Sequence, residues 1–117
     1  MIPRYKRKEI SKIWEPENKF NIWLKIELLI CEALSNRGDI PKDSFKTIKK
    51  NARFDIQRID VIEKDVKHDV IAFLTNIGEN IGHDSRFVHM GVTSSDIIDT
   101  AFSIQLKQSC SILKREL

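Results

Sequence analysis

Apolar residues recur at three- and four-residue intervals along most of the chain, and no stretch shows the strict alternation of a β-strand. The clearest run covers residues 17–37, and Gly38 after it is suited to a left-handed helix cap. Its apolar stripe comprises Phe20, Trp23, Leu24, Leu28, Cys31 and Leu34, widened by Ile22, Ile26 and Ile30. The spacing predicts a long helix that buries more than one face. A short helix is expected before it at residues 8–14, closed by Glu15 and Pro16.

Shorter apolar repeats in the middle of the chain predict three further helices. The first begins at Pro41, because proline is well tolerated in the first turn of a helix. The second has Asp55 as its N-cap, since a carboxylate there can accept the unpaired backbone N–H groups. The third follows Asp69, and we expect Gly78 and Gly82 to loosen its end.

A second long helix is predicted from about residues 94–96 to the end of the chain. Apolar residues stay in helical phase through "SILKREL", and no cap, glycine or proline follows them. We therefore expect the chain to stop within a helix, whose wide apolar stripe associates with another copy or with a missing C-terminal part. The predicted organisation is all-α, with a helical domain at residues 1–92 and the truncated start of a long bundle helix at 93–117.

Composition favours an ordinary globular domain. Hydrophobic residues make up 41% of the chain and charged residues 32%, and no signal peptide or membrane-spanning stretch is visible, so we expect a cytoplasmic protein. The net charge of +3 is mild and the basic residues are interspersed with acids, which leaves nucleic-acid binding a minor alternative. Cys31 and Cys110 both lie in helical, apolar surroundings, which predicts reduced core thiols and no disulfide or metal pair.

The stretch "HMGVTSSDIIDT" places hydrogen-bonding side chains directly before the second long helix. Backbone N–H groups at a helix start lack partners and carry the positive end of the helix dipole, so Thr93, Ser94 and Ser95 could complete a site for a carboxylate or phosphate. The simpler interpretation is that one of these residues is the N-cap and that Asp96 favours the positive helix end. The residues of this stretch leave both interpretations open.

Two other short segments could also bind an anion. Lys67, His68 and Asp69 stand at a predicted helix start, and Arg4 and Tyr5 lie near the N-terminus. Considered separately, the histidine is typical of a surface or capping residue, and the N-terminal pair is typical of a frayed tail. The occurrence of all three segments in one chain favours an anion-binding function.

These segments together resemble a known enzyme family. The stretches "MIPRY", "KFNIWLKIELLICEAL", "FDIQRIDVIEKDVKHDVIAFL" and "RFVHMGVTSSDIIDTA" are similar to the N-terminal part of adenylosuccinate lyases, within the fumarase/aspartase superfamily. The resemblance covers essentially the whole chain. It implies an all-α fold, assembly of four subunits through a long helical bundle, and no metal or organic cofactor. It also implies β-elimination of fumarate from adenylosuccinate, which leaves AMP, and from the succinylated imidazole carboxamide ribotide.

The resemblance also implies roles for individual residues. The set that it assigns to substrate binding is Arg4, Tyr5, Lys67, His68, Asp69, Thr93 and Ser94. The N-terminal pair would contact the nucleotide, and the two hydroxyl residues would bind a succinyl carboxylate. His68 and His89 would orient the substrate and support the acid–base pair. Lys67 stands where some family members carry arginine, and a lysine cannot make the bidentate contact of a guanidinium.

The same resemblance places the main catalytic groups outside this sequence. The general-acid histidine, and the serine and lysine of a mobile glycine-rich loop, belong to later parts of family members, so we expect the 117-residue chain alone to be inactive. Three other functions remain open. They are a complete but non-catalytic helical association module, a small nucleotide- or RNA-binding domain, and another superfamily lyase. The Lys67–Asp69 triplet and the Arg4–Tyr5 pair favour a nucleotide substrate over the different substrate of another superfamily lyase.

Overall fold

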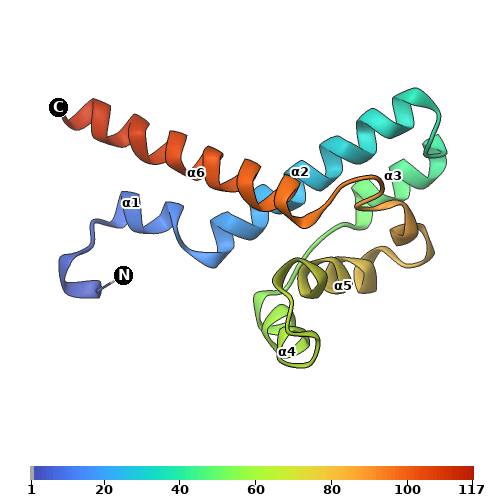
Figure 1. The fold of residues 1–117 in the computed structure, drawn as a ribbon, viewed down its shortest axis with the longest axis horizontal. Coiled ribbons are helices and arrows are strands. Elements are labelled where there is room, and N and C mark those ends of the chain that lie inside the picture. Colours follow the sequence, from blue (N-terminus) through green and yellow to red (C-terminus); the bar gives the residue numbers. More distant parts are fainter. Residues whose placement is uncertain (1) are drawn as a thin grey trace.

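The computed structural model describes residues 2–117, and every regular element in that range is a helix (Figure 1). In chain order the elements are η1 (Pro3–Tyr5), α1 (Lys8–Ile13), α2 (Pro16–Arg37), α3 (Lys42–Asn51), α4 (Ile56–Val66), α5 (Asp69–Ile81), η2 (His83–Phe87) and α6 (Ser94–Glu116), where η marks a 3-10 helix. The predicted all-α class is therefore confirmed. None of the helices in the described part is long and apolar enough to cross a membrane.

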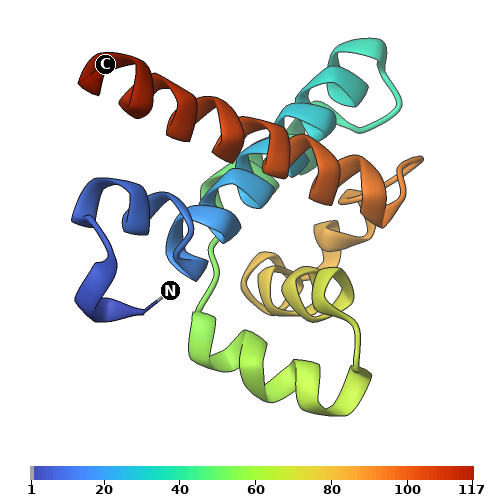
Figure 2. The same cartoon turned by 60° about the vertical axis from the view of Figure 1, so that its left-hand side comes forward.

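The two long helices, α2 and α6, cross each other, and the shorter helices pack around them (Figures 1 and 2). Helices α4 and α5 contact each other along their length as an antiparallel hairpin, and α3 packs against α2. The N-terminal α1 lies instead against the C-terminal half of α6. This arrangement places the N-terminus on the opposite side of the helix crossing from the loop that leads into α6.

Local sequence signals set most helix boundaries. Pro16 is the first residue of α2, and Gly38 ends that helix with a φ of 88°, in the left-handed region that glycine adopts without strain. Pro41 lies one residue before α3 rather than inside it. Asp55 is the N-cap of α4, and its Oδ1 accepts the N–H groups of Gln57 at 2.9 Å and of Arg58 at 3.2 Å. The predicted caps at Gly38 and Asp55 are thus confirmed.

Gly78 behaves differently from the expectation. Helix α5 continues through Gly78 to Ile81 and ends at Gly82, so only the second glycine interrupts it. A side chain at position 78 would place its Cβ 3.5 Å from both the Cβ and the Oγ of Ser85. The prediction that Gly78 loosens the helix is therefore wrong, because the helical hydrogen bonds continue past this glycine, whose carbonyl accepts the Gly82 N–H at 2.9 Å.

The core is centred on Phe73 of α5, which is fully buried. Its ring stacks on Phe20 with a centroid distance of 5.6 Å, and it meets the Trp23 ring edge-on at 5.5 Å. Phe54, in the link before α4, completes this aromatic cluster, and its ring centroid lies 6.2 Å from that of Phe73. Aromatic side chains bury large areas, so the cluster joins α2, α5 and the α3–α4 link into one apolar unit.

The two cysteines differ in their surroundings. Cys31 of α2 is fully buried, in agreement with the predicted core thiol. Cys110 of α6 is exposed, so the prediction of a second core thiol is wrong for the described residues. The physical reason is the position of α6, whose C-terminal half packs on α1 and the start of α2 and leaves Cys110 uncovered. Large apolar residues of this helix are exposed as well, namely Phe102, Leu106 and Leu113.

Polar contacts hold α1 against α6. The Nε1 group of Trp14, next to α1, donates to Oγ of Ser109 at 3.2 Å. Arg7 pairs with Glu116 at 3.3 Å, and Arg115 pairs with Glu9. These ion pairs are solvent-exposed, and such pairs contribute little to stability. A buried hydrogen bond adds to them, from Nε2 of Gln105 to the Ile13 carbonyl at 2.9 Å, and α1 also contacts α2.

Candidate functional site

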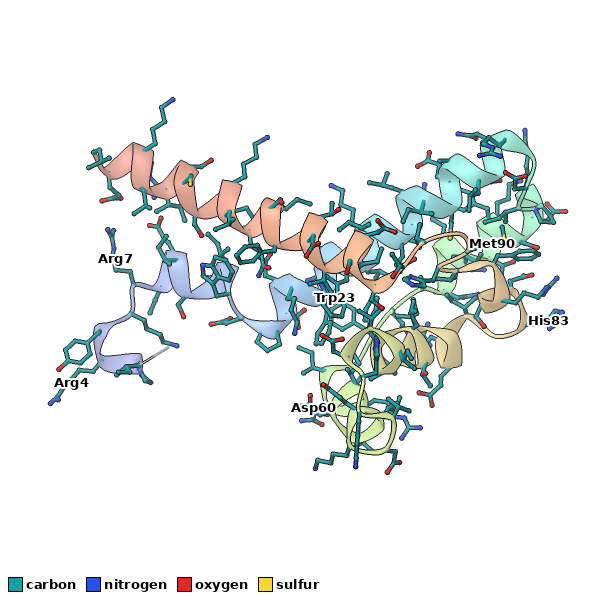
Figure 3. All side chains as sticks on the ribbon, viewed as in Figure 1. Arg4, Arg7, Trp23, Asp60, His83 and Met90 are labelled. Atoms are coloured by element: carbon teal, nitrogen blue, oxygen red, sulfur yellow. The ribbon has the colours of Figure 1, made fainter. Side chains whose placement is uncertain are left out.

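The described structure does not bring the sequence-predicted site residues together in one place. Arg4 and Tyr5 form the exposed η1 turn at one end of the molecule (Figure 3). The triplet 67–69 forms the turn between α4 and α5, and the third group lies at the start of α6 and in the loop before it. Figures 1 and 2 agree that the N-terminal segment is remote from the other two groups. A site that uses all of these residues therefore requires more than this one chain.

The turn between α4 and α5 holds its side chains in defined positions. Lys67 has a φ of 53° and ends α4, and its N–H donates to the Glu63 carbonyl at 2.8 Å. His68 is the N-cap of α5, and its Nδ1 accepts the Ile71 N–H at 3.2 Å. Because Nδ1 is an acceptor here, the hydrogen of the neutral ring is on Nε2, which is thereby left as a donor.

The third residue of the turn extends this polar surface. Oδ1 of Asp69 accepts the Val70 N–H at 2.7 Å and lies 3.8 Å from Nδ1 of His68. Both side chains are partly exposed, at 46% for the aspartate and 41% for the histidine. The turn therefore presents an imidazole donor and a carboxylate acceptor side by side, which suits a ligand with mixed hydrogen-bonding groups.

At the start of α6, Thr93 is the N-cap and forms a capping box with Asp96. Oδ2 of Asp96 accepts the Thr93 N–H at 2.9 Å, which confirms the simpler interpretation of this segment. The capping box does not use the backbone N–H groups of Ser94 and Ser95. These two residues belong to the first turn of α6, where an N–H group has no helix carbonyl four residues earlier to donate to. An anion site built on these two amides and the hydroxyls stays a prediction.

His89, in the loop before α6, makes the closest polar contact with the helical core. Its backbone has a φ of 66°, which is uncommon for a residue other than glycine. Its Nδ1 lies 2.6 Å from Oε1 of Glu27, a residue of α2 whose side chain is only 1% exposed. Glu27 is not among the site residues predicted from the sequence. One feature of the sequence indicates it. Glu27 is a charged residue one helical turn from both Trp23 and Cys31, at a position where the apolar pattern requires a buried residue.

Burial controls the protonation of this region. Removal from water raises the pKa of the Glu27 carboxyl above its usual range, and the hydrogen bond and charge of His89 offset only part of this effect. Burial, together with the neighbouring Glu27 charge, also raises the pKa of the Cys31 thiol to about 11. Cys31 is therefore a neutral, unreactive thiol at physiological pH.

The raised pKa of Glu27 predicts a pH dependence of stability. The folded protein binds the Glu27 proton more tightly than the unfolded chain, so this contribution to the free energy of unfolding is complete below the unfolded pKa of about 4.3. It is lost as the pH rises through the folded pKa. We expect Glu27→Gln to gain stability relative to the wild-type chain between pH 4 and pH 8, as measured by urea unfolding at each pH.

The matched control for this measurement is Glu32→Gln. Glu32 lies on the exposed side of the same helix, so its replacement should leave the pH profile unchanged. If Glu27→Gln lost stability relative to the wild type as the pH rose, the ion pair with His89 would outweigh the burial of the carboxylate.

Other surface features lie away from these residues. A hollow of about 570 Å³ is formed by α2, the α3–α4 link and the start of α4, and its lining residues include Asn21, Arg53 and Phe54. None of the sequence-predicted site residues belongs to it within the described range. Among residues 2–117, no three His, Cys, Asp or Glu side chains are grouped so as to hold a metal ion.

Comparison with known proteins identifies the family. A family model described as "Lyase" matches residues 4–117. The chain belongs to this lyase family. The adenylosuccinate lyase of Bacillus subtilis (strain 168) is 50% identical over 117 residues, which are 100% of this chain and 27% of that protein. The adenylosuccinate lyase of Staphylococcus saprophyticus is 44% identical over the same shares of the two chains.

These relatives confirm the resemblance predicted from the sequence, and the chain spans about a quarter of their length. A crystal structure of fumarate lyase from Mesorhizobium sp. BNC1 is similar with a TM-score of 0.82, over 91% of this chain and 26% of that chain. At 18% sequence identity this similarity establishes the fold alone. The lyase fold therefore rests on both the family match and the structural match.

Proposed function

We propose that the chain acts as the N-terminal part of an adenylosuccinate lyase, a cytoplasmic enzyme of purine biosynthesis. The supporting observation is the 50% identity to the Bacillus subtilis enzyme along all 117 residues. The substrates would be adenylosuccinate and the succinylated imidazole carboxamide ribotide, each of which would release fumarate. The remaining residues of the enzyme would come from the rest of a longer polypeptide, which assembles as a homotetramer.

The proposed reaction is a β-elimination. A base removes a carbon-bound proton next to a carboxylate, the electron pair moves into an aci-carboxylate, the C–N bond breaks, and an acid protonates the departing nitrogen. Stabilisation of the doubly charged aci-carboxylate is the demanding step. The amides and hydroxyls around Thr93 and Ser94 suit a succinyl carboxylate, since helix-start N–H groups favour anions.

The other candidate residues would contact the nucleotide part of the substrate. The guanidinium of Arg4 suits a phosphate group, with Tyr5 beside it. The turn of Lys67, His68 and Asp69 offers an ammonium, an imidazole donor and a carboxylate to the same ligand. Because these groups are far apart in one chain, we propose that a complete site combines segments from several subunits, as the family resemblance implies.

The test of this function is an assay of the full-length polypeptide that carries these residues, captured from its source cells. We expect an intact mass several times 13.6 kDa and release of AMP and fumarate from adenylosuccinate, followed by absorbance. The 117-residue chain, assayed beside it, should release neither, since it would lack the main acid and base. A native product of 13.6 kDa without lyase activity would instead favour a non-catalytic helical module.

A further inference from the structure

The pair of Glu27 and His89 has a feature that the proposed function does not explain. Oε1 of Glu27 lies 2.6 Å from Nδ1 of His89, while Oε2 is buried and has no hydrogen-bond partner in the described part of the chain. A buried carboxylate that is only half paired is unfavourable, and replacing such a group by a neutral one is often neutral or stabilising. Fold stability alone therefore gives no reason for an acid at position 27.

The backbone of His89 adds a second unfavourable feature at the same place. A residue other than glycine in the left-handed region is strained, and it persists where the surrounding structure fixes it. This conformation accompanies a ring whose Nδ1 meets Glu27 in the core. The side chain of His89 is 18% exposed, and its Nε2 is neither buried nor bonded to any of residues 2–117. One ring nitrogen thus meets the buried Glu27, and the other has no hydrogen-bond partner among residues 2–117.

We propose that Glu27 is a positioning residue that accepts the Nδ1–H of His89 and so presents Nε2 of that ring to the substrate of the lyase. The proposal rests on the proposed function. A carboxylate accepts hydrogen bonds and donates none, so it selects the ring form with a hydrogen on Nδ1. Nε2 then accepts a hydrogen bond from the ligand when the ring is neutral, or donates one when the ring is protonated. In both states the same nitrogen is available at the entrance to α6.

The test uses the full-length polypeptide with Glu27→Gln, His89→Ala and the double variant. A glutamine side chain can donate as well as accept, so it keeps the shape of Glu27 but no longer selects the ring form. We expect Glu27→Gln to lower kcat/KM for adenylosuccinate about 10- to 100-fold, as small misplacements of substrate-orienting groups do, without lowering the melting temperature. In the His89→Ala background the same change should alter kcat/KM less than about twofold, because coupled residues are not additive.

The control is Glu32→Gln on the exposed side of α2, which should leave kcat/KM unchanged. The proposal is overturned if Glu27→Gln leaves kcat/KM unchanged, or if it has the same effect with and without His89. A purely structural role would instead lower the melting temperature and act equally in both backgrounds.

A second readout separates this proposal from the proposed function. In solid-state ¹⁵N spectra of histidine-labelled protein, the signal of His89 is identified by its absence from His89→Ala. We expect a protonated Nδ1 in the wild type and a changed signal in Glu27→Gln. If the wild-type polypeptide does not cleave adenylosuccinate, the proposed function fails, and the spectra alone decide whether Glu27 fixes the ring. An unchanged signal in Glu27→Gln would overturn the positioning role whatever the enzyme's substrate.

Discussion

Replacement of His68 by asparagine in the full-length polypeptide is expected to lower kcat/KM for adenylosuccinate by about 100-fold or more, with an unchanged melting temperature. Asparagine is a strong N-cap and can accept the Ile71 N–H in place of Nδ1, so helix α5 keeps its first turn. The variant loses only the imidazole and its Nε2 donor. Steady-state kinetics and thermal unfolding of the same preparation measure the two effects separately.

The matched control is His83→Asn. His83 lies on η2, is exposed, and belongs to none of the segments predicted to bind substrate. Its replacement should leave both kcat/KM and the melting temperature unchanged. A His68→Asn enzyme with normal kcat/KM would show that this histidine only caps the helix, which is the simpler interpretation of its position.

The second large effect is on stability. Phe73→Ala is expected to lower the free energy of unfolding of the 117-residue chain by about 3–5 kcal/mol, because truncation of a buried phenylalanine leaves a cavity. Phe73 is fully buried against Phe20 and Trp23, so the cavity would lie where α2 and α5 meet. A domain of this size is stable by about 5–15 kcal/mol, so the variant should unfold at a much lower urea concentration.

Phe102→Ala provides the comparison for this measurement. Phe102 lies on α6, is 50% exposed and touches Trp14 at a ring distance of 5.8 Å, so the same truncation there removes little buried area. We expect Phe102→Ala to lower the free energy of unfolding by much less than Phe73→Ala does. Equal losses at the two positions would contradict a core centred on the α2–α5 contact.

Much of the fold could be predicted from the sequence because its signals are local. Gly38 and Asp55 act through their own backbone conformation or through amides two and three residues away, so their roles depend little on tertiary context. Gly78 and Cys110 differ from the sequence prediction for the opposite reason. The continuation of α5 past Gly78 and the exposure of Cys110 both depend on how the helices pack, which the local pattern does not show.

The candidate site was less predictable, because its contacts join distant parts of the chain. Glu27 and His89 are 62 positions apart, and neither has a local pattern that indicates the other. Thr93 carried a clear local signal, and the structure shows it as the N-cap that such a signal predicts. The separation of Arg4 from the other candidate residues follows from the way α1 packs on α6, which no pattern in the N-terminal sequence indicates.

The packing of α1 on α6 also makes the N-terminal segment sensitive to ionic strength. The pairs of Arg7 with Glu116 and of Arg115 with Glu9 are exposed, and dissolved salt screens such charges over distances of about 10 Å or less. The aromatic core around Phe73 contains no comparable charge pair among the described residues and is not weakened in this way. Salt therefore weakens some of the contacts that position Arg4 and Tyr5, and leaves the aromatic core around Phe73 packed.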